Sequence, residues 1–126
     1  MAAANVRVLL ADDDRRFLES LRSLIDGQPH LSVAGTAGDG LAAIELADEL
    51  DPDAVVIDLH MPLLDGVSAC ARLRRDHPNL CLIALTGDAS QKLHDAAIDA
   101  GADEVIVKED FVEALMDQLR AVRKKQ

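Results

Sequence analysis

The sequence predicts an α/β domain built around one doubly wound parallel sheet. Its 126 residues are enough for a single domain with one buried core. Five short apolar runs alternate with five helical patterns, which is the order of strands and helices in such a sheet. Several of these runs are apolar nearly throughout, as expected of parallel strands that are covered on both faces. We therefore expect helices on both faces of the sheet and one domain over residues 1–126.

The five runs are rich in Val, Ile and Leu and have the length of strands. In chain order they are VRVLLA (Val6–Ala11), LSVAGT (Leu31–Thr36), AVVID (Ala54–Asp58), CLIALT (Cys81–Thr86) and EVIVK (Glu104–Lys108). The first, third and fourth runs carry the most continuous apolar character, so we expect them to be the most deeply buried strands.

A helical pattern follows each run. The first pattern ends at the segment DGQPH, the second covers Asp39 to about Leu50, the third ends near Pro78, and the fourth covers about Gln91 to Ala100. Gly101 follows the fourth pattern as a C-terminal cap. The residues expected to face the core from the five helices are Phe17, Leu18, Leu21, Leu24, Ile25, Leu41, Ile44, Ala47, Val67, Cys70, Leu73, Val112, Leu115, Met116, Leu119 and Val122.

Composition excludes several classes of function. The 13 Lys and Arg residues against 23 Asp and Glu give a net charge of −10, which repels a nucleic-acid backbone. The only aromatic residues are Phe17 and Phe111, too few to form stacking platforms for single-stranded nucleic acid. The N-terminus lacks the basic region of a signal peptide, and no apolar stretch is long enough to span a membrane. We expect a cytoplasmic protein in which Cys70 and Cys81 are reduced core residues.

Polar residues stand at the carboxyl ends of the predicted strands, where the functional site of a doubly wound sheet lies. They are Asp12, Asp13 and Asp14 after the first strand, Asp58 at the end of the third, Thr86 at the end of the fourth and Lys108 at the end of the fifth. Each residue alone has an ordinary explanation as a helix cap, a turn residue or a surface charge. Together they bring a carboxylate cluster, a hydroxyl and an ammonium to the same edge of the sheet.

This combination predicts a site for a metal and a phosphoryl group. Crowded carboxylates cannot all remain ionised at low cost unless a cation joins them. Ligands that are all oxygen indicate a hard ion, Mg²⁺ rather than Zn²⁺, and Mg²⁺ commonly binds a phosphate oxygen as well. Lys108 could then neutralise one phosphoryl oxygen and Thr86 could donate a hydrogen bond to another. Asp58 could attack phosphorus as a carboxylate nucleophile.

Four motifs give the sequence a close resemblance to the receiver domain of two-component response regulators. They are LLADDDRRF, VVIDLHMPLLDG, LTGDA and GADEVIVK, which are spread along the whole chain. The segment DLHMPLLDG is the most specific of them, whereas an isolated acidic pair or a single lysine would be a weak signal. The resemblance implies a flavodoxin-like (βα)₅ sandwich with the strand order 2-1-3-4-5. The segment VKEDFVEAL is similar to receivers that precede a helix-turn-helix output domain.

The resemblance assigns roles to the acidic residues. It implies that Asp58 is the phosphoacceptor, that Asp13 binds Mg²⁺ directly and that Asp12 does so largely through water. Asp58 and the backbone carbonyl of His60 would supply the other protein ligands of the metal. Asp14 falls outside this pair, and we interpret it as an acid at the start of the first helix, where the helix dipole favours a negative charge.

The resemblance also implies how the domain signals. A sensor histidine kinase or a histidine phosphotransfer protein would donate the phosphoryl group, with Lys108 pairing with it and Thr86 acting as the switch hydroxyl. The surface around the fourth helix and fifth strand would then change and control an output domain or a downstream protein. His60 and Asp88 stand where family members tune autodephosphorylation. The chain would be a signalling phosphoacceptor rather than an enzyme beyond its own phosphorylation and dephosphorylation.

Two positions depart from the family pattern. Val105 stands where an aromatic residue is frequent, so an aromatic rotamer switch is not expected at that position. Glu109 replaces a frequent proline, so we expect a trans peptide bond between Lys108 and Glu109.

Several alternatives remain beside this interpretation. A haloacid-dehalogenase-type phosphatase would need Asp-x-Asp followed by Thr or Val, but Arg15 and Arg16 follow Asp14. A flavodoxin-like electron carrier would need a hydroxyl-rich phosphate loop where the three acids stand. A receiver fold used only for phosphorylation-independent interaction would not need every chemical position intact. Residues 120–126 (RAVRKKQ) are either the start of a linker or the frayed end of the last helix, and a homodimer could form on phosphorylation.

Overall fold

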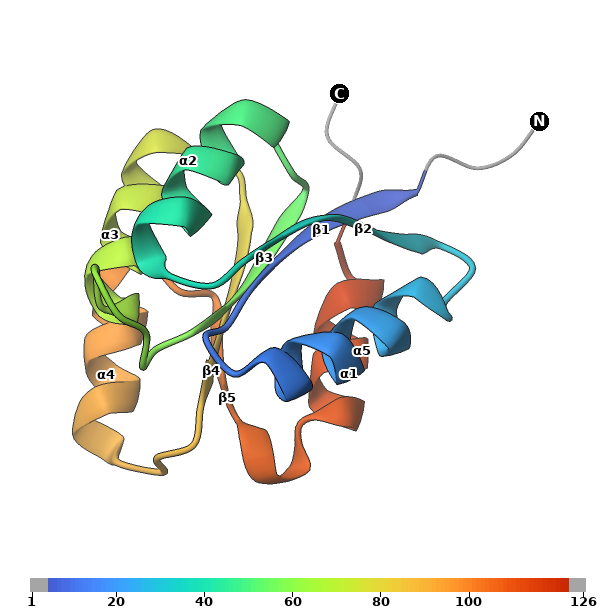
Figure 1. Ribbon diagram of the computed structural model, residues 1–126. Helices are drawn as coiled ribbons and strands as arrows, with labels where there is room; N and C mark the ends of the chain where they lie inside the picture. The colour runs from blue at the N-terminus through green and yellow to red at the C-terminus, as the bar shows by residue number, and fades with distance from the viewer. Residues whose placement is uncertain (1–4, 123–126) are drawn as a thin grey trace.

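The computed structural model describes residues 5–122 as one five-stranded parallel sheet with helices on both faces (Figure 1). Its elements are β1 (Val6–Ala11), α1 (Arg15–Asp26), β2 (Leu31–Ala37), α2 (Gly40–Leu50), β3 (Ala54–Asp58), α3 (Gly66–Asp76), β4 (Cys81–Thr86), α4 (Gln91–Ala100), β5 (Glu104–Val107), the 3₁₀ turn η1 (Lys108–Asp110) and α5 (Val112–Arg120). The strand order is β2-β1-β3-β4-β5, which confirms the predicted doubly wound, flavodoxin-like fold.

The sheet separates two apolar layers. Leu9 and Val55 point to one face and pack with α2, α3 and α4, whereas Val8 and Val56 point to the other face and pack with α1 and α5. Figure 1 shows the same division, with α1 and α5 on one side of the sheet and the other three helices opposite. All four side chains are fully buried because successive residues of a strand face opposite sides and both sides are covered.

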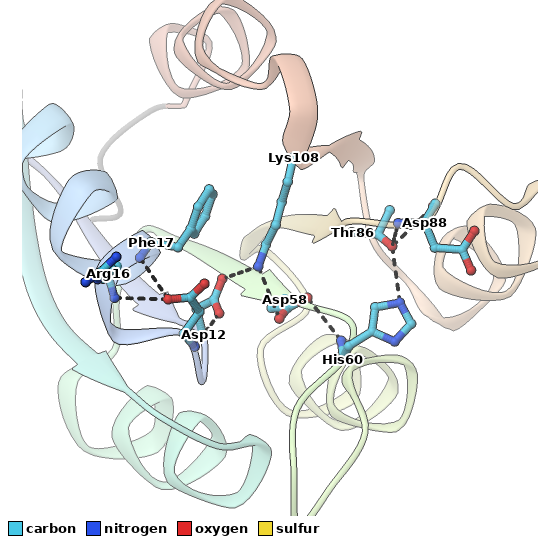
Figure 2. Close-up of polar contacts among 9 residues, drawn as sticks. Asp12, Arg16, Phe17, Asp58, His60, Thr86, Asp88 and Lys108 are labelled. Carbon is cyan, nitrogen blue, oxygen red and sulfur yellow. Dashed lines mark hydrogen bonds and ion pairs between the residues drawn. The ribbon is translucent and has the colours of Figure 1, made fainter.

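The predicted element bounds need small corrections. The second strand extends one residue further, to Ala37, and the fifth ends at Val107 rather than Lys108. Lys108 instead begins the 3₁₀ turn η1, and its side chain points toward Asp12 and Asp58 at the end of the sheet (Figure 2). The described residues contain no cis peptide bond, so the Lys108–Glu109 bond is trans as expected.

Two residues expected to face the core do not do so. Leu41 is 42% exposed. Gly40, at the start of α2, packs closely against the Leu64 backbone. The buried residues of α2 are instead Gly40, Ala43, Ile44 and Ala47. Val112 is 46% exposed, because Phe111, the residue just before α5, takes the inward place at this end of the helix.

The remaining predicted core residues of the helices are buried or half-buried. Met116 is 7% exposed and fills the core between α5 and the sheet, as predicted. Both cysteines are free, with Cys70 buried and Cys81 half-buried. Burial raises the pKa of the Cys70 thiol to about 12 and that of Cys81 to about 11, so both are held as neutral thiols.

Aspartate side chains cap the first three helices, and Asp14 does so as the sequence indicates. Asp14 caps α1 by accepting hydrogen bonds from the backbone N–H groups of Arg16 and Phe17 at 3.0 and 3.2 Å. Asp39 and Asp65 cap α2 and α3 in the same way. Gly101 ends α4 with a φ of 121°, a conformation that side chains disfavour, which confirms its role as a C-terminal cap. No helix among the described residues is long and apolar enough to cross a membrane.

The loop from β3 to α3 is closely packed. The Gly66 N–H donates to the Leu59 carbonyl at 3.1 Å, which closes the loop over the end of β3. A Cβ atom on Gly66 would lie 2.3 Å from the Leu59 Cα and 2.7 Å from the Asp58 carbonyl oxygen. Only glycine therefore fits at this point of the loop without displacing backbone next to Asp58.

We predict that Gly66→Ala lowers the free energy of unfolding by about 1–3 kcal/mol, because the added methyl group meets backbone atoms that cannot rotate away. Denaturant titration followed by circular dichroism measures this loss. Gly38→Ala is the matched control, since a Cβ there would have no atom within 4 Å. Equal stability of the two variants would contradict this account of the loop.

Candidate functional site

The candidate site lies at the carboxyl edge of the sheet, where β1 and β3 end side by side in its centre (Figure 2). The pairing of β1 with β3 sets Ala11 beside Ile57, so the residues that follow, Asp12 and Asp58, emerge next to each other. The loops after β4 and β5 complete the edge with Thr86 and Lys108. The topology thus brings together the strand ends that the sequence predicts to meet.

The two central carboxylates are almost completely buried. Asp12 is 1% exposed, and its Oδ1 accepts a hydrogen bond from the Asp14 N–H at 2.8 Å. Asp58 is 4% exposed, and its Oδ1 accepts from the His60 N–H at 3.1 Å. One oxygen of each carboxylate is therefore fixed by the backbone two residues further along, which orients the other oxygen into the site.

Lys108 lies between these two carboxylates. Its Nζ is 2.7 Å from Asp12 Oδ2 and 3.3 Å from Asp58 Oδ2 (Figure 2). Burial alone would lower the pKa of Lys108, but the two carboxylates outweigh it and raise that pKa, so the ammonium stays charged.

The balance is different at Asp58. Burial raises the pKa of Asp58, and the negative charge of Asp12 adds to the rise. The hydrogen bond from the His60 N–H and the charge of Lys108 act in the opposite direction without cancelling it. Asp58 is therefore a more basic carboxylate than an exposed aspartate, and a second cation beside it would favour its ionised form.

Three carboxylates could hold a metal ion together. Asp12, Asp13 and Asp58 each offer one oxygen, and these oxygens lie within 4.8 Å of one another. Asp13 is exposed, so it extends the buried pair toward solvent. When all three are ionised, three negative charges against the one positive charge of Lys108 leave two unbalanced charges, which a divalent cation would neutralise. The donors are all oxygen, which suits a hard ion such as Mg²⁺.

A second group of side chains lies beside the first, at the end of β4. Thr86 is 2% exposed, and its Oγ1 accepts from the Asp88 N–H at 3.0 Å and donates to the Asp88 carbonyl at 3.2 Å. The exposed His60 reaches over to this group, with its Nε2 3.4 Å from Thr86 Oγ1 (Figure 2). The Asp88 carboxylate accepts from the Ser90 N–H at the start of α4. His60 thus joins the Asp58 loop to the Thr86 loop.

Gly87 leaves free space in this second group. It lies between Thr86 and Asp88, and a Cβ atom on it would meet nothing within 4 Å. A side chain at this position would therefore project into open space, in contrast to one at Gly66 in the loop after Asp58.

The structure adds two residues that the sequence did not assign to the site. Lys108 Nζ lies 4.4 Å from the centroid of the Phe17 ring, and the Phe17 and Phe111 ring centroids are 5.1 Å apart. The available signal was that these are the only two aromatic residues of the chain. The position of Phe17 in the first helix and of Phe111 just before the last helix did not by themselves predict a contact with Lys108.

Comparison with known proteins agrees with this arrangement. A family model described as the response regulator receiver domain matches residues 8–120. The response regulator MprA of Mycobacterium sp. (strain KMS) is 40% identical over 117 residues, which cover 93% of this chain and 50% of that protein. The nitrate/nitrite response regulator protein NarP of Escherichia coli (strain K12) is 38% identical over 120 residues, covering 94% and 55% respectively. The chain thus spans about half the length of the curated relatives it matches.

Solved structures show the same fold. The response regulator domain of Thermotoga maritima CheB superposes with a TM-score of 0.85 and 30% sequence identity, covering 92% of this chain and 94% of that one. The Francisella response regulator 1452 receiver domain gives a TM-score of 0.84 and 28% identity over 92% of this chain and 94% of that one. The chain therefore belongs to the family of response regulator receiver domains, the family that its sequence motifs resemble.

Proposed function

We propose that this domain accepts a phosphoryl group on Asp58 in a Mg²⁺-dependent transfer from a phosphohistidine. The donor is a sensor histidine kinase or a histidine phosphotransfer protein. The observation that carries the proposal is the meeting of three carboxylates within 4.8 Å with the Lys108 ammonium directly beside two of them. A buried carboxylate between a fixed positive charge and a place for a divalent cation suits attack on phosphorus.

The donor set fits Mg²⁺. Asp12, Asp13 and Asp58 would hold it, together with the backbone carbonyl of His60, and Asp12 would act largely through water. Bound there, the ion would offset the charge on the oxygens of the transferred group.

The side chains of the chain perform the remaining work. Asp58 forms a bond to phosphorus as the bond from phosphorus to the donor histidine breaks, and the electron pair of that bond stays on the histidine nitrogen. The hydrogen bond from the His60 N–H fixes Asp58 Oδ1, so the carboxylate keeps one orientation during attack. Lys108 already lies 3.3 Å from Asp58 Oδ2 and can follow the negative charge onto a phosphoryl oxygen.

The signal then passes to the side of the sheet that carries α4 and β5. Thr86 would leave its bonds with the Asp88 backbone and donate its hydroxyl to the phosphoryl group, which draws the β4–α4 turn toward Asp58. Position 105 is a buried valine rather than an aromatic residue, so small side chains and backbone transmit this change instead of an aromatic rotamer. A partner that binds one form better responds to it.

We further propose that residues 1–126 act as a single receiver domain that controls an output domain or a downstream protein in the cytoplasm, with transcription as the regulated process. This chain matches only 50% of MprA and 55% of NarP, which supports a role of this kind of domain within a longer regulator. Of the segment 120–126, the structure describes Arg120, which ends α5, and the two residues after it, and residues 123–126 lie outside the described part.

Asp58→Asn should abolish covalent phosphorylation, because the amide oxygen is not a nucleophile of comparable strength. We expect one phosphate on the wild-type protein after incubation with acetyl phosphate and Mg²⁺, none on this variant, and one on the control Asp110→Asn, which alters an exposed acid. Intact-mass spectrometry measures all three. A phosphate on the Asp58→Asn protein would place the acceptor elsewhere and overturn the proposal.

Asp13→Asn should weaken Mg²⁺ binding by at least roughly tenfold. Removing an outer-shell partner of a metal already causes a loss of this size, and Asp13 is proposed to bind the ion directly. Mg²⁺ titration followed by thermal unfolding gives the affinity. Asp14→Asn is the matched control, because asparagine caps a helix as well as aspartate does and its side chain lies outside the cluster. Equal Mg²⁺ affinities of the two variants would argue against the cluster as the metal site.

His60→Ala and Asp88→Ala should each alter the rate of autodephosphorylation. The His60 ring contacts Thr86 Oγ1, and the Asp88 carboxylate accepts from the Ser90 N–H and so fixes the turn that holds Thr86. Both side chains therefore border the proposed approach to the phosphorylated carboxylate. The decay of phosphoprotein after removal of acetyl phosphate, followed by intact mass, measures the rate. If both variants decay at the wild-type rate, the two residues have no such role.

A further inference from the structure

The two aromatic residues of the chain meet at Lys108. Phe17 comes from the first turn of α1, and Phe111 directly precedes α5, so they are far apart in the sequence. Their ring centroids nevertheless lie 5.1 Å apart with an interplanar angle of 54°. One of the two aromatic rings of the chain therefore lies over the lysine of the site, and the other packs against that ring.

The Phe17 ring forms one wall around the Lys108 ammonium. Lys108 Nζ lies 4.4 Å from the ring centroid, 2.7 Å from the Asp12 carboxylate and 3.3 Å from the Asp58 carboxylate. Figure 2 shows the Phe17 side chain alongside the end of the lysine, next to Asp12. The ammonium therefore contacts both negative oxygens and the negative face of a ring.

Phe111 packs against the Phe17 ring. It lies three residues after Lys108, so the segment from the turn η1 to α5 carries both the lysine and the residue that backs the Phe17 ring. Both rings also pack into the apolar layer of α1 and α5, which restrains their orientation. The position of the Lys108 ammonium therefore depends on how Phe17 of α1 packs against Phe111 at the start of α5.

A lysine side chain needs such restraint. Its four-carbon stem is flexible, and the ammonium is a compact charge without the directional fork of arginine. A ring face within about 6 Å attracts an ammonium and excludes water from that side. A leucine of similar bulk would exclude water but would offer no such attraction.

We propose that Phe17 is a positioning residue for phosphoryl transfer: its ring, backed by Phe111, holds the Lys108 ammonium over Asp12 and Asp58. The proposal rests on the proposed phosphorylation of Asp58 and adds a residue through which Lys108 is kept in place. Phe17 touches no reacting atom and acts only through the lysine.

Phe17→Leu should slow phosphorylation by acetyl phosphate about two- to fivefold at saturating Mg²⁺, the factor that corresponds to a cation–π contact of about 0.5–1 kcal/mol. Phe17→Tyr keeps the ring and should restore the rate to within about twofold of wild type. Phe111→Leu removes a ring from the same layer without removing the direct contact with Lys108, so a smaller loss is expected. Initial rates from intact-mass spectrometry provide the comparison.

A fluorine series at position 17 separates attraction from packing. Replacement of Phe17 by 4-fluoro- and then 3,4,5-trifluorophenylalanine keeps the shape of the ring while it weakens the negative face stepwise. The rate should fall with each step while the midpoint of thermal unfolding stays nearly constant. A rate that is unchanged across the series, or unchanged in Phe17→Leu, would overturn the proposal and leave Phe17 as a packing residue. If Phe17→Leu fails to fold, the fluorine series and Phe17→Tyr still decide.

The same experiment keeps the two proposals apart. If the wild-type protein accepts no phosphate on Asp58, the proposed function itself is wrong. If the wild-type protein is phosphorylated but its rate ignores the electron density of the Phe17 ring, only the positioning role is lost.

Discussion

The charge balance among Asp12, Asp58 and Lys108 is the interaction on which the rest of this structure depends. Two carboxylates with almost no exposure stand side by side because β1 and β3 are neighbours in the centre of a parallel sheet. Burying two like charges at this distance is costly, and Lys108 reduces that cost through contacts of 2.7 and 3.3 Å. The turn η1 after β5 is what allows the lysine to reach back over the sheet edge to meet them.

The positive charge of Lys108 does not balance all the carboxylates at this edge of the sheet, and the excess negative charge determines what the site can bind. One ammonium cannot neutralise Asp12, Asp13 and Asp58 together, and the pKa of Asp58 stays raised by burial despite the nearby lysine. A cation bound next to Asp58 would lower the electrostatic cost of burying these carboxylates. A phosphoryl group on Asp58 would move negative charge from the buried carboxylate toward solvent. The proposed phosphoacceptor role of Asp58 therefore depends on a cation that balances these charges.

Much of this architecture follows from the sequence alone. The strands could be predicted because they are short runs rich in Val, Ile and Leu, with β1, β3 and β4 apolar nearly throughout. The set of residues at the sheet edge could be predicted because parallel strands end at one edge. The inward faces of α2 and α5 were less predictable. Leu41 and Val112 fit a helical period, but the close approach of Gly40 to Leu64 and the inward place of Phe111 depend on neighbours from distant parts of the chain. The contact of Phe17 with Lys108 was beyond prediction for the same reason, since it requires the path of η1.

The packing of Gly66 against Leu59 makes the two sides of the site mechanically unequal. On the Asp58 side, backbone lies against backbone with no spare volume, whereas the turn at Gly87 on the Thr86 side borders open space. Space for an added side chain therefore exists at the turn after β4 but not at the loop after β3. In the proposed switch, we therefore expect the backbone movement to fall mainly on the β4–α4 turn, because the β3–α3 loop at Gly66 has no room to adjust.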